Sequence, residues 1–393
     1  MHLRGILLCT AVLLAAVVIF HAADSAKLPP PYATPSANNG PRVIPQPPGT
    51  RLNVPPGFDI EIWAEGFQRP RYMMLGPSNE VILADAAGKP HGTIYVFQGK
   101  ERKTLIEGLY QPYGLAYQDG YLYVGESDSI KRYKYDSKAM TAGKGEEIIS
   151  LKGIDTHHWT RSLLIDRAGR KIYVGVGSGS NDSTGEDPRR AAISRYNLDG
   201  TGHEIFASGT RNPIGMHWYP GTDTLWAAVQ ERDTLGDDLV PDYFTHIHQG
   251  GFYGWPYAYA GTNEDPINKG QRPDLVAKTI VPDVLLGAHV AVLDYVFYTG
   301  KQFPAEYQGG AFLALHGSWN RAKRVGQSVA FIPFHDGKPS GELREVVSGW
   351  MLGPDQREVW GRPVALLQLP DGSLLISEDG NKRIWRLAYK GKS

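Results

Sequence analysis

Two short clusters in this sequence contain residue types that can move protons or bind metal ions. His157 and His158 are adjacent and directly precede an apolar segment. An imidazole there can act as a general base near neutral pH. The alternative is a structural pair of loop histidines, one of which is hydrogen-bonded to the backbone. Residues 231–238 (ERDTLGDD) supply carboxylate oxygens of the kind that Ca²⁺ binds, without the spacing of an EF-hand. A solvated acidic turn is the alternative.

Four arginines recur at similar places along the chain, each within two residues of the start of a repeated segment: Arg71, Arg161, Arg211 and Arg362. Repeat starts gather around one axis if the repeats close into a ring. Guanidinium groups brought together repel each other unless an anion lies among them, and arginine binds carboxylates in bidentate fashion. The pattern therefore indicates an anion site, unless each arginine pairs with its own neighbouring carboxylate.

The segments that must position these residues are short apolar strands separated by turns. A pattern of apolar run, Gly/Asp turn, second run and third strand begins near Pro70, Pro112, Thr160, Pro213, Leu293 and Pro363. The clear copies are about 40 to 55 residues apart, near the length of a four-stranded propeller blade. The sequence thus predicts an all-β fold, a six-bladed β-propeller of four-stranded antiparallel blades over residues 57–390.

Two further segments bear on this prediction. Residues 58–63 form a spare strand, which we expect to pair into the last blade and close the ring. The interval 231–292 is too long for a plain loop, so we expect a long insert with structure of its own, in a position where function often concentrates.

Composition narrows the class of protein. The chain has 46 Gly and 28 Pro in 393 residues, which fits a turn-rich protein better than a helical bundle. Lys and Arg together number 41, as do Asp and Glu, so net charge gives no reason to expect nucleic acid or an anionic membrane as partner.

The N-terminus resembles a targeting segment. Residues 1–26 combine Arg4, an apolar stretch and small residues, which is typical of a secretory signal peptide. An uncleaved anchor is the alternative, and membrane contact is expected only through this segment. Cys9, the only cysteine, lies inside it. Residues 27–56 are rich in Pro, Asn and Ser and predict an extended tether. The expected location is periplasmic or secreted.

Several motifs together resemble the glucose/sorbosone dehydrogenase family, most closely its sorbosone dehydrogenase-like branch. They are residues 158–161 (HWTR), 209–215 (GTRNPIG), 231–238, 250–256 (GGFYGWP), 316–321 (HGSWNR), Arg362 and 379–381 (DGN). The similarity covers about residues 54–388. It implies a six-bladed propeller that holds pyrroloquinoline quinone (PQQ) over the channel mouth beside Ca²⁺.

The resemblance also implies roles for individual residues. His158 corresponds to the family's catalytic base, with His157 in reserve or in contact with substrate. The expected cofactor contacts are Arg161, Arg211, Asn212 and Arg362, together with Arg321 or Lys323, one of which would replace the family's cofactor lysine. Calcium is expected at Glu231, Asp233 and Thr234, partly through main-chain carbonyls. Trp319 is a candidate to contact substrate.

The predicted activity is oxidation of a sugar hydroxyl or hydrated aldehyde. The resemblance implies that histidine removes a proton while hydride passes to quinone C5, with Ca²⁺ as Lewis acid and an external cytochrome or quinone as electron acceptor. A secreted, non-catalytic propeller that binds a glycan or protein is the main alternative, because the cofactor lysine lacks a clean counterpart. A metal-dependent lactonase has thinner support.

Overall fold

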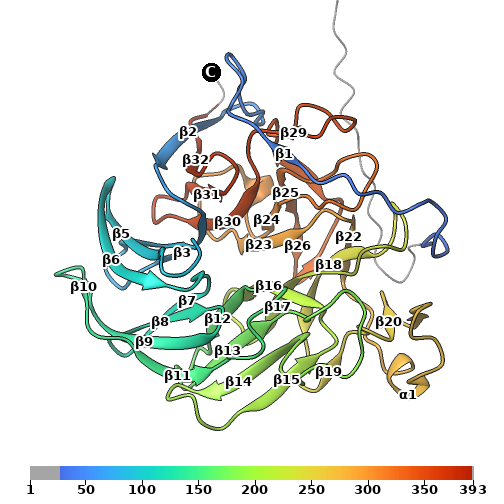
Figure 1. Ribbon diagram of the computed structural model, residues 1–393. Coiled ribbons are helices and arrows are strands. Elements are labelled where there is room, and N and C mark those ends of the chain that lie inside the picture. The colour runs from blue at the N-terminus through green and yellow to red at the C-terminus, as the bar shows by residue number, and fades with distance from the viewer. Residues whose placement is uncertain (1–26, 392–393) are drawn as a thin grey trace, which may run out of the picture.

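The computed structural model describes residues 27–391, and the predicted signal segment 1–26 lies outside them. Six antiparallel sheets surround a central axis (Figure 1). The six-bladed all-β fold predicted from the repeats is confirmed. Helix is nearly absent from the described residues: α1 spans Pro273–Val276, and a single 3-10 turn spans Ala305–Tyr307.

Each blade runs outward from the axis in strand order. Blade 1 contains β3 (Pro70–Leu75), β4 (Val81–Asp85), β5 (Gly92–Gln98) and β6 (Glu101–Leu109). Blade 2 contains β7 (Leu115–Gln118), β8 (Tyr121–Glu126), β9 (Ser129–Asp136) and β11 (Glu146–Ser150), with β10 (Thr141–Ala142) also on β9. Blade 3 contains β12 (Arg161–Ile165), β13 (Lys171–Val176), β14 (Ala192–Asn197) and β15 (Glu204–Ser208).

The second half of the ring repeats this order. Blade 4 contains β16 (Asn212–Trp218), β17 (Leu225–Gln230), β18 (Pro241–Ile247) and β22 (Val284–Ala288). Blade 5 contains β23 (Val292–Phe297), β24 (Ala311–Leu315), β25 (Ser328–Ile332) and β28 (Arg344–Val347). Blade 6 contains β30 (Pro363–Gln368), β31 (Leu374–Glu378), β32 (Arg383–Tyr389) and, as its outer strand, β2 (Phe58–Glu65). The expected N-terminal strand therefore completes the last blade.

Packing between blades explains why the second strands are almost continuous apolar runs. Strands β4, β24 and β31 are buried along their whole length because blades cover both faces. Near the axis the backbones approach each other closely: a Cβ added to Gly114 would lie 2.6 Å from the amide nitrogen of Leu163. Glycine is required at such a contact, since any side chain would push two blades apart.

The interval 231–292, predicted to be one long insert, is only in part extra structure. It contains β18 and β22, the two outer strands of blade 4, and the excursion between them holds β19 (Gly251–Phe252), β20 (Ala258–Tyr259), β21 (Asn263–Glu264) and α1. Strand β19 adds in parallel to the outer edge of blade 3. The extra structure is therefore confined to the excursion, which braces blade 3 against blade 4.

The proline-rich segment 27–56, predicted to be an extended tether, packs on the propeller. Its strand β1 (Arg42–Val43) pairs in parallel with β29 (Glu358–Val359), just before blade 6 (Figure 1). Two short strands, β26 (Phe334–His335) and β27 (Lys338–Pro339), form a hairpin on blade 5. None of the helices within residues 27–391 is long and apolar enough to cross a membrane.

Candidate functional site

One mouth of the central channel opens into a cavity of about 550 Å³. This volume is in the range typical of sites for small ligands and cofactors. Its lining comes from loops that enter or leave the inner strands of blades 1, 3, 4, 5 and 6. The charged and histidine side chains among the lining residues are Arg69, Arg71, His157, His158, Arg211, Glu231, Asp233, Asp242, His289, His316 and Arg362. The propeller thus brings together most of the residues that the sequence singled out.

The two adjacent histidines occupy different environments. His158 is partly buried, and its Nδ1 lies 2.8 Å from the carbonyl oxygen and 3.1 Å from Oγ of Ser178. Because a carbonyl oxygen can only accept, Nδ1 carries the hydrogen, and Nε2 keeps its lone pair. His157 is exposed, with its ring centre 4.4 Å from that of His158. Of the two histidines, His158 is therefore the better oriented to accept a proton.

Burial and positive charge keep His158 neutral. Burial lowers its pKa well below the usual histidine value, and the nearby Arg211 guanidinium and His157 lower it further. The pKa of His157 is also lowered, by burial first and Arg211 second. A neutral imidazole at neutral pH can accept a proton without first losing one.

The sequence predicts that Arg161 contacts a cofactor, but the structure places its side chain elsewhere. Its side chain is fully buried, and its guanidinium donates to the main-chain oxygens of Ile154, His158 and Thr160 at 2.5, 2.8 and 2.8 Å. It does not line the cavity. The expectation of a cofactor contact is corrected: Arg161 is a positioning residue that fixes the turn carrying His158.

Three arginines form a basic half of the cavity. Arg71 is buried and donates to the carboxylate of Asp379 at 2.5 Å, and Nε of Arg69 lies 3.7 Å from the same carboxylate. Arg362 lies beside them and donates to the carbonyl oxygens of His316, at 3.2 Å, and Gly317. Two of the three guanidinium groups thus contact one carboxylate, and the third contacts only carbonyl oxygens, which leaves this half of the site with excess positive charge.

The pKa values of these arginines and of Asp379 are consistent with an excess of positive charge. Burial lowers the pKa of Arg362 to about 10, and that of Arg69 to about 10, with Arg71 adding to the effect on Arg69. Burial raises the pKa of the Asp379 carboxyl, but neighbouring basic groups outweigh burial and hold the pKa well below the usual range. An anion bound here would stabilise the arginines in their charged form.

Blade 4 supplies an acidic half. Glu231 and Asp242 are buried, and burial raises their pKa values to about 8 and about 7 respectively. The carboxylate of Asp242 accepts hydrogen bonds from the amides of Glu231 and Ala291 at 2.8 and 2.6 Å. A cation nearby would favour the ionised form of both acids.

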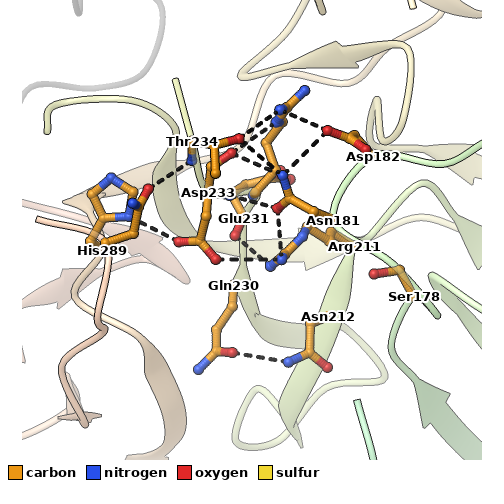
Figure 2. Close-up of polar contacts among 12 residues, drawn as sticks. Ser178, Asn181, Asp182, Arg211, Asn212, Gln230, Glu231, Asp233, Thr234 and His289 are labelled. Atoms are coloured by element: carbon orange, nitrogen blue, oxygen red, sulfur yellow. Dashed lines mark hydrogen bonds and ion pairs between the residues drawn. The ribbon is translucent and has the colours of Figure 1, made fainter. Parts of the chain in front are cut away.

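Two oxygens lining the cavity lack donors among the described residues: Oδ1 of Asn212 and Oε1 of Glu231. The side-chain amide of Asn212 is anchored through its nitrogen, because Nδ2 donates to the side-chain oxygen of Gln230 at 2.9 Å (Figure 2). Buried acceptors without donors are uncommon, and hard cations bind such oxygens. The donor set therefore fits Ca²⁺, although the described residues contain no cluster of three or more Asp, Glu, His or Cys side chains that could hold a metal.

Both carboxylate oxygens of Asp233 have partners, whereas Glu231 has one carboxylate oxygen without a partner among the described residues. Its carboxylate lies 3.2 Å from Nδ1 of His289 and 3.7 Å from Arg211, as Figure 2 shows. Its main-chain oxygen accepts from Asn181 at 3.0 Å and from Arg232 at 3.2 Å. Of the predicted metal ligands, Glu231 keeps a free oxygen, whereas Asp233 already has a full set of partners.

Arg211 lines the cavity, but most of its hydrogen-bond donors bind other groups of the protein. It donates to the carbonyl oxygen of Glu231 at 2.5 Å and to Oδ1 of Asn181 at 3.1 Å, while its Nε has no partner among the described residues. Thr234 also lines the cavity, and its backbone φ is 76°. Arg211 therefore braces the loop that carries Glu231, and its charge helps to keep the His158 pKa low.

Trp319 borders the cavity with 41% of its surface exposed, so its ring is accessible to a ligand. Arg321 and Lys323 do not line the cavity. Arg321 instead donates to the carbonyl oxygen of Asp237 at 2.5 Å and to the Asp238 carboxylate at 2.8 Å. Lys323 is exposed, so the structure does not bring either candidate for the cofactor lysine to the cavity.

Sequence reasoning missed four residues of the site: Arg69, Asp242, His289 and Asp379. Arg69 stands two positions before Arg71, at a repeat start, so the signal was available. Asp379 belongs to one of the family-like motifs. Asp242 and His289 lie inside the long interval, where no spacing rule indicated which side chains return to the axis.

Comparisons with known proteins identify related sequences and structures. A model of the family described as TrAA12-like matches residues 52–390. A protein of Borreliella burgdorferi named only as uncharacterized is 29% identical over 353 residues, covering 86% of this chain and 91% of the relative. A PQQ-dependent pyranose dehydrogenase of Coprinopsis cinerea is 23% identical over 86% of this chain. The match spans 54% of that enzyme's length.

A solved structure supports the fold. The holo PQQ domain of pyranose dehydrogenase from Coprinopsis cinerea superposes with a TM-score of 0.74 at 19% identity, covering 88% of this chain and 98% of that domain. At this level of identity the likeness concerns the architecture alone.

Proposed function

Since the chain belongs to the TrAA12-like family, we propose that it is a PQQ-dependent dehydrogenase of aldose- or sorbosone-type sugars. The family resemblance read from the sequence is confirmed by the family match and by relatives named as PQQ-dependent dehydrogenases. The substrate and the mechanism given below belong to the proposal.

One observation carries the proposal: a single cavity has a basic half and an acidic half beside a neutral imidazole. PQQ has three carboxylates, and Arg69, Arg71 and Arg362 would hold them. The free oxygens of Asn212 and Glu231 would take part in holding Ca²⁺. A tricarboxylate with a divalent cation matches both halves at once, which neither a neutral sugar nor a lone anion does.

The bound quinone would supply the two-electron acceptor, and Ca²⁺ would act as a Lewis acid and as an anchor. Nε2 of His158 accepts the proton of the sugar hydroxyl. The carbon that carries this hydroxyl becomes a carbonyl carbon. The Ser178 carbonyl stabilises the resulting imidazolium through Nδ1. Trp319 offers a flat apolar face to the sugar ring.

The same proposal covers location and electron transfer. The N-terminal targeting pattern supports a periplasmic or secreted protein, and an external cytochrome or quinone would then reoxidise the cofactor. A sugar is the small-molecule partner that the named relatives support.

The decisive experiment titrates purified apo-protein with PQQ and Ca²⁺, then follows redox-dye reduction with a panel of aldoses. We expect Arg362→Gln to weaken quinone binding by at least about tenfold, because it removes a charged partner in a desolvated site. Lys323→Gln, on the exposed side of the same rim, is the matched control and should leave binding unchanged. Absence of both a spectral change and dye reduction would favour the non-catalytic propeller that binds a glycan or protein.

Metal removal gives an independent prediction. Chelation should abolish dye reduction, and added Ca²⁺ should restore it, because the ion both polarises the quinone and neutralises carboxylate charge. The far-ultraviolet circular dichroism should stay unchanged, since the six blades do not depend on this loop. Full activity in excess chelator would contradict the calcium assignment.

A further inference from the structure

Residues 32–43, called here the N-terminal strap, lie along the rim of the cavity. They precede the region that matches the family, which begins at residue 52. In Figure 1 the strap is the part of the blue segment that leads to β1, beside β29. The strap is therefore a part of the rim that the family-matched propeller does not supply.

The strap is bonded to the loop of blade 5 that carries Trp319. The amide of Asn39 donates to the Trp319 carbonyl oxygen at 2.7 Å, and its Nδ2 donates to the carbonyl oxygens of Ala322 and Arg321 at 2.8 and 3.1 Å. Arg324, which is buried, donates back to the Asn39 carbonyl oxygen at 2.8 Å. Asn39 thus holds both ends of the turn that presents Trp319.

The strap is also bonded to the loop of blade 4 that follows Glu231. The amide of Tyr32 donates to the Leu235 carbonyl oxygen at 2.8 Å. Oγ1 of Thr34 accepts from the Asp237 amide at 2.7 Å. Both loops that border the cavity on this side are therefore fastened to one segment.

Asn320 joins the three pieces. Its side chain is buried, with Nδ2 donating to the Ala37 carbonyl oxygen and Oδ1 accepting from the Thr234 amide, both at 2.7 Å. Thr234 lines the cavity. A displacement of the strap would leave one end of the Asn320 amide without its partner, and this would loosen the contact to Thr234.

The strap reaches the cavity itself. Pro41 lines it together with Trp319. A Cβ added to Gly40 would lie 3.9 Å from Cβ of Trp319, so the strap backbone packs directly against that side chain. A proline ring and an accessible indole face form a rigid apolar surface, which suits the C–H face of a sugar ring.

We propose that the N-terminal strap is a specificity element of the substrate pocket. It positions Trp319 through Asn39, and Pro41 forms part of the wall that the sugar contacts. The identification of the ligand as a sugar rests on the proposed function, whereas the role of the strap in ligand binding rests on its contacts.

The test compares Asn39→Ala with Gln46→Ala in the full chain. Gln46 also has an amide that donates to a main-chain oxygen, but it lies beyond the strap and pairs with Arg383. We expect Asn39→Ala to raise the sugar KM by about fivefold to tenfold, the loss expected from two hydrogen bonds, with kcat and quinone affinity nearly unchanged. Gln46→Ala should change none of the three.

Hydrogen exchange followed by mass spectrometry gives a readout besides turnover. Asn39→Ala should speed exchange in residues 317–322, and the sugar should protect these residues less than in the wild type. Faster exchange with an unchanged KM would overturn the proposal, because the strap would then have only a structural role.

Failure of the proposed function would be seen separately, as a wild-type protein that reduces no dye. Sugar-dependent protection of residues 317–322 then decides the strap's role. Protection that Asn39→Ala weakens supports the strap as part of a binding site, and no protection by any sugar of the panel overturns it.

Discussion

Of the two adjacent histidines in this cavity, His158 is the one that the structure orients for proton transfer. Its Nδ1 is fixed by the Ser178 carbonyl, and burial together with the Arg211 charge keeps the ring neutral. His157 lies next to it but is exposed and has no comparable anchor. The sequence left the choice between the two open, and the hydrogen-bond geometry favours His158.

Replacing this base gives the first residue-level prediction. General-base catalysis contributes about 10²- to 10⁴-fold, so His158→Ala should lower kcat by about that factor. Quinone affinity should hardly change, because in the proposed complex the arginines, and not His158, would bind the quinone carboxylates. His157→Ala is the matched control and should lower kcat by less than about tenfold. Equal losses in both variants, measured by steady-state dye reduction, would contradict the assignment.

The pH dependence of turnover follows from the direction of the same shift. Because burial and Arg211 place the folded-state pKa of His158 below the ordinary value of about 6.5, the reactive neutral form persists throughout neutral pH. We expect kcat/KM to stay flat there and to fall only at more acidic pH, as His158 becomes protonated. An acid limb centred at or above the ordinary histidine pKa would contradict this.

At the scale of the element, the turn before β12 must hold its shape for His158 to work. Arg161 closes that turn by donating to three main-chain oxygens from a fully buried position. Burial, with Arg190 nearby, lowers its pKa to about 9, so the guanidinium stays charged at neutral pH. Arg161 holds the turn in shape because no water can replace its guanidinium as the donor to these buried carbonyl oxygens.

Arg161→Met tests this role because the substitution keeps a long apolar side chain but removes every donor. We expect a loss of stability of about 3 kcal/mol and a lower kcat, with quinone affinity little changed. Thermal unfolding and equilibrium dye titration measure these quantities. Arg170→Met, at an exposed turn of the same blade, is the control and should lie within about 0.5 kcal/mol of the wild type. A weakened quinone affinity without loss of stability would restore Arg161 as a cofactor contact.

At the scale of the whole molecule, the ring depends on the seam between blade 6 and blade 1. Strand β2 comes from the N-terminal side of the chain yet pairs along β32, and Trp63 on β2 packs against Phe97 of blade 1 with ring centres 4.8 Å apart. One apolar cluster spans this seam. The first and last parts of the propeller are therefore joined by a non-local strand pair and by shared side-chain packing.

Trp63→Ala should open this seam. Truncating a buried tryptophan costs about 3 to 5 kcal/mol, so we expect a clear fall in the denaturant midpoint and reduced quinone binding as the rim loosens. Ile62→Ala, on the same strand but 38% exposed, should cost less than about 1 kcal/mol. Equal shifts for both variants would show that the seam does not limit stability.

The bipolar cavity is likewise a property of the whole ring. Arg69 and Arg71 come from blade 1, Arg362 from blade 6, and the acids Glu231 and Asp242 from blade 4. Three of the six blades contribute one or two of these groups each, and only the closed ring sets the basic side opposite the acidic side. For that reason the formal net charge of zero carries no information about this site.

The sequence by itself determined the number and type of the blades, the closing strand and the segments that meet at the channel mouth. These follow from local periodicity, because alternating apolar runs and turn residues specify strands without reference to distant parts of the chain. The family-like motifs also marked most of the lining residues.

Only the tertiary structure decided which way each side chain points. Arg161 and Arg321 share residue type and motif with true lining residues, yet carbonyl oxygens and a carboxylate bind their guanidinium groups. Lys323 lies two residues beyond the same motif, and it is exposed. Asp242, His289 and the N-terminal strap reach the cavity through long-range packing, which leaves no periodic signal in the chain. A side chain's direction depends on which partners lie around it in the fold, and the sequence order does not record those partners.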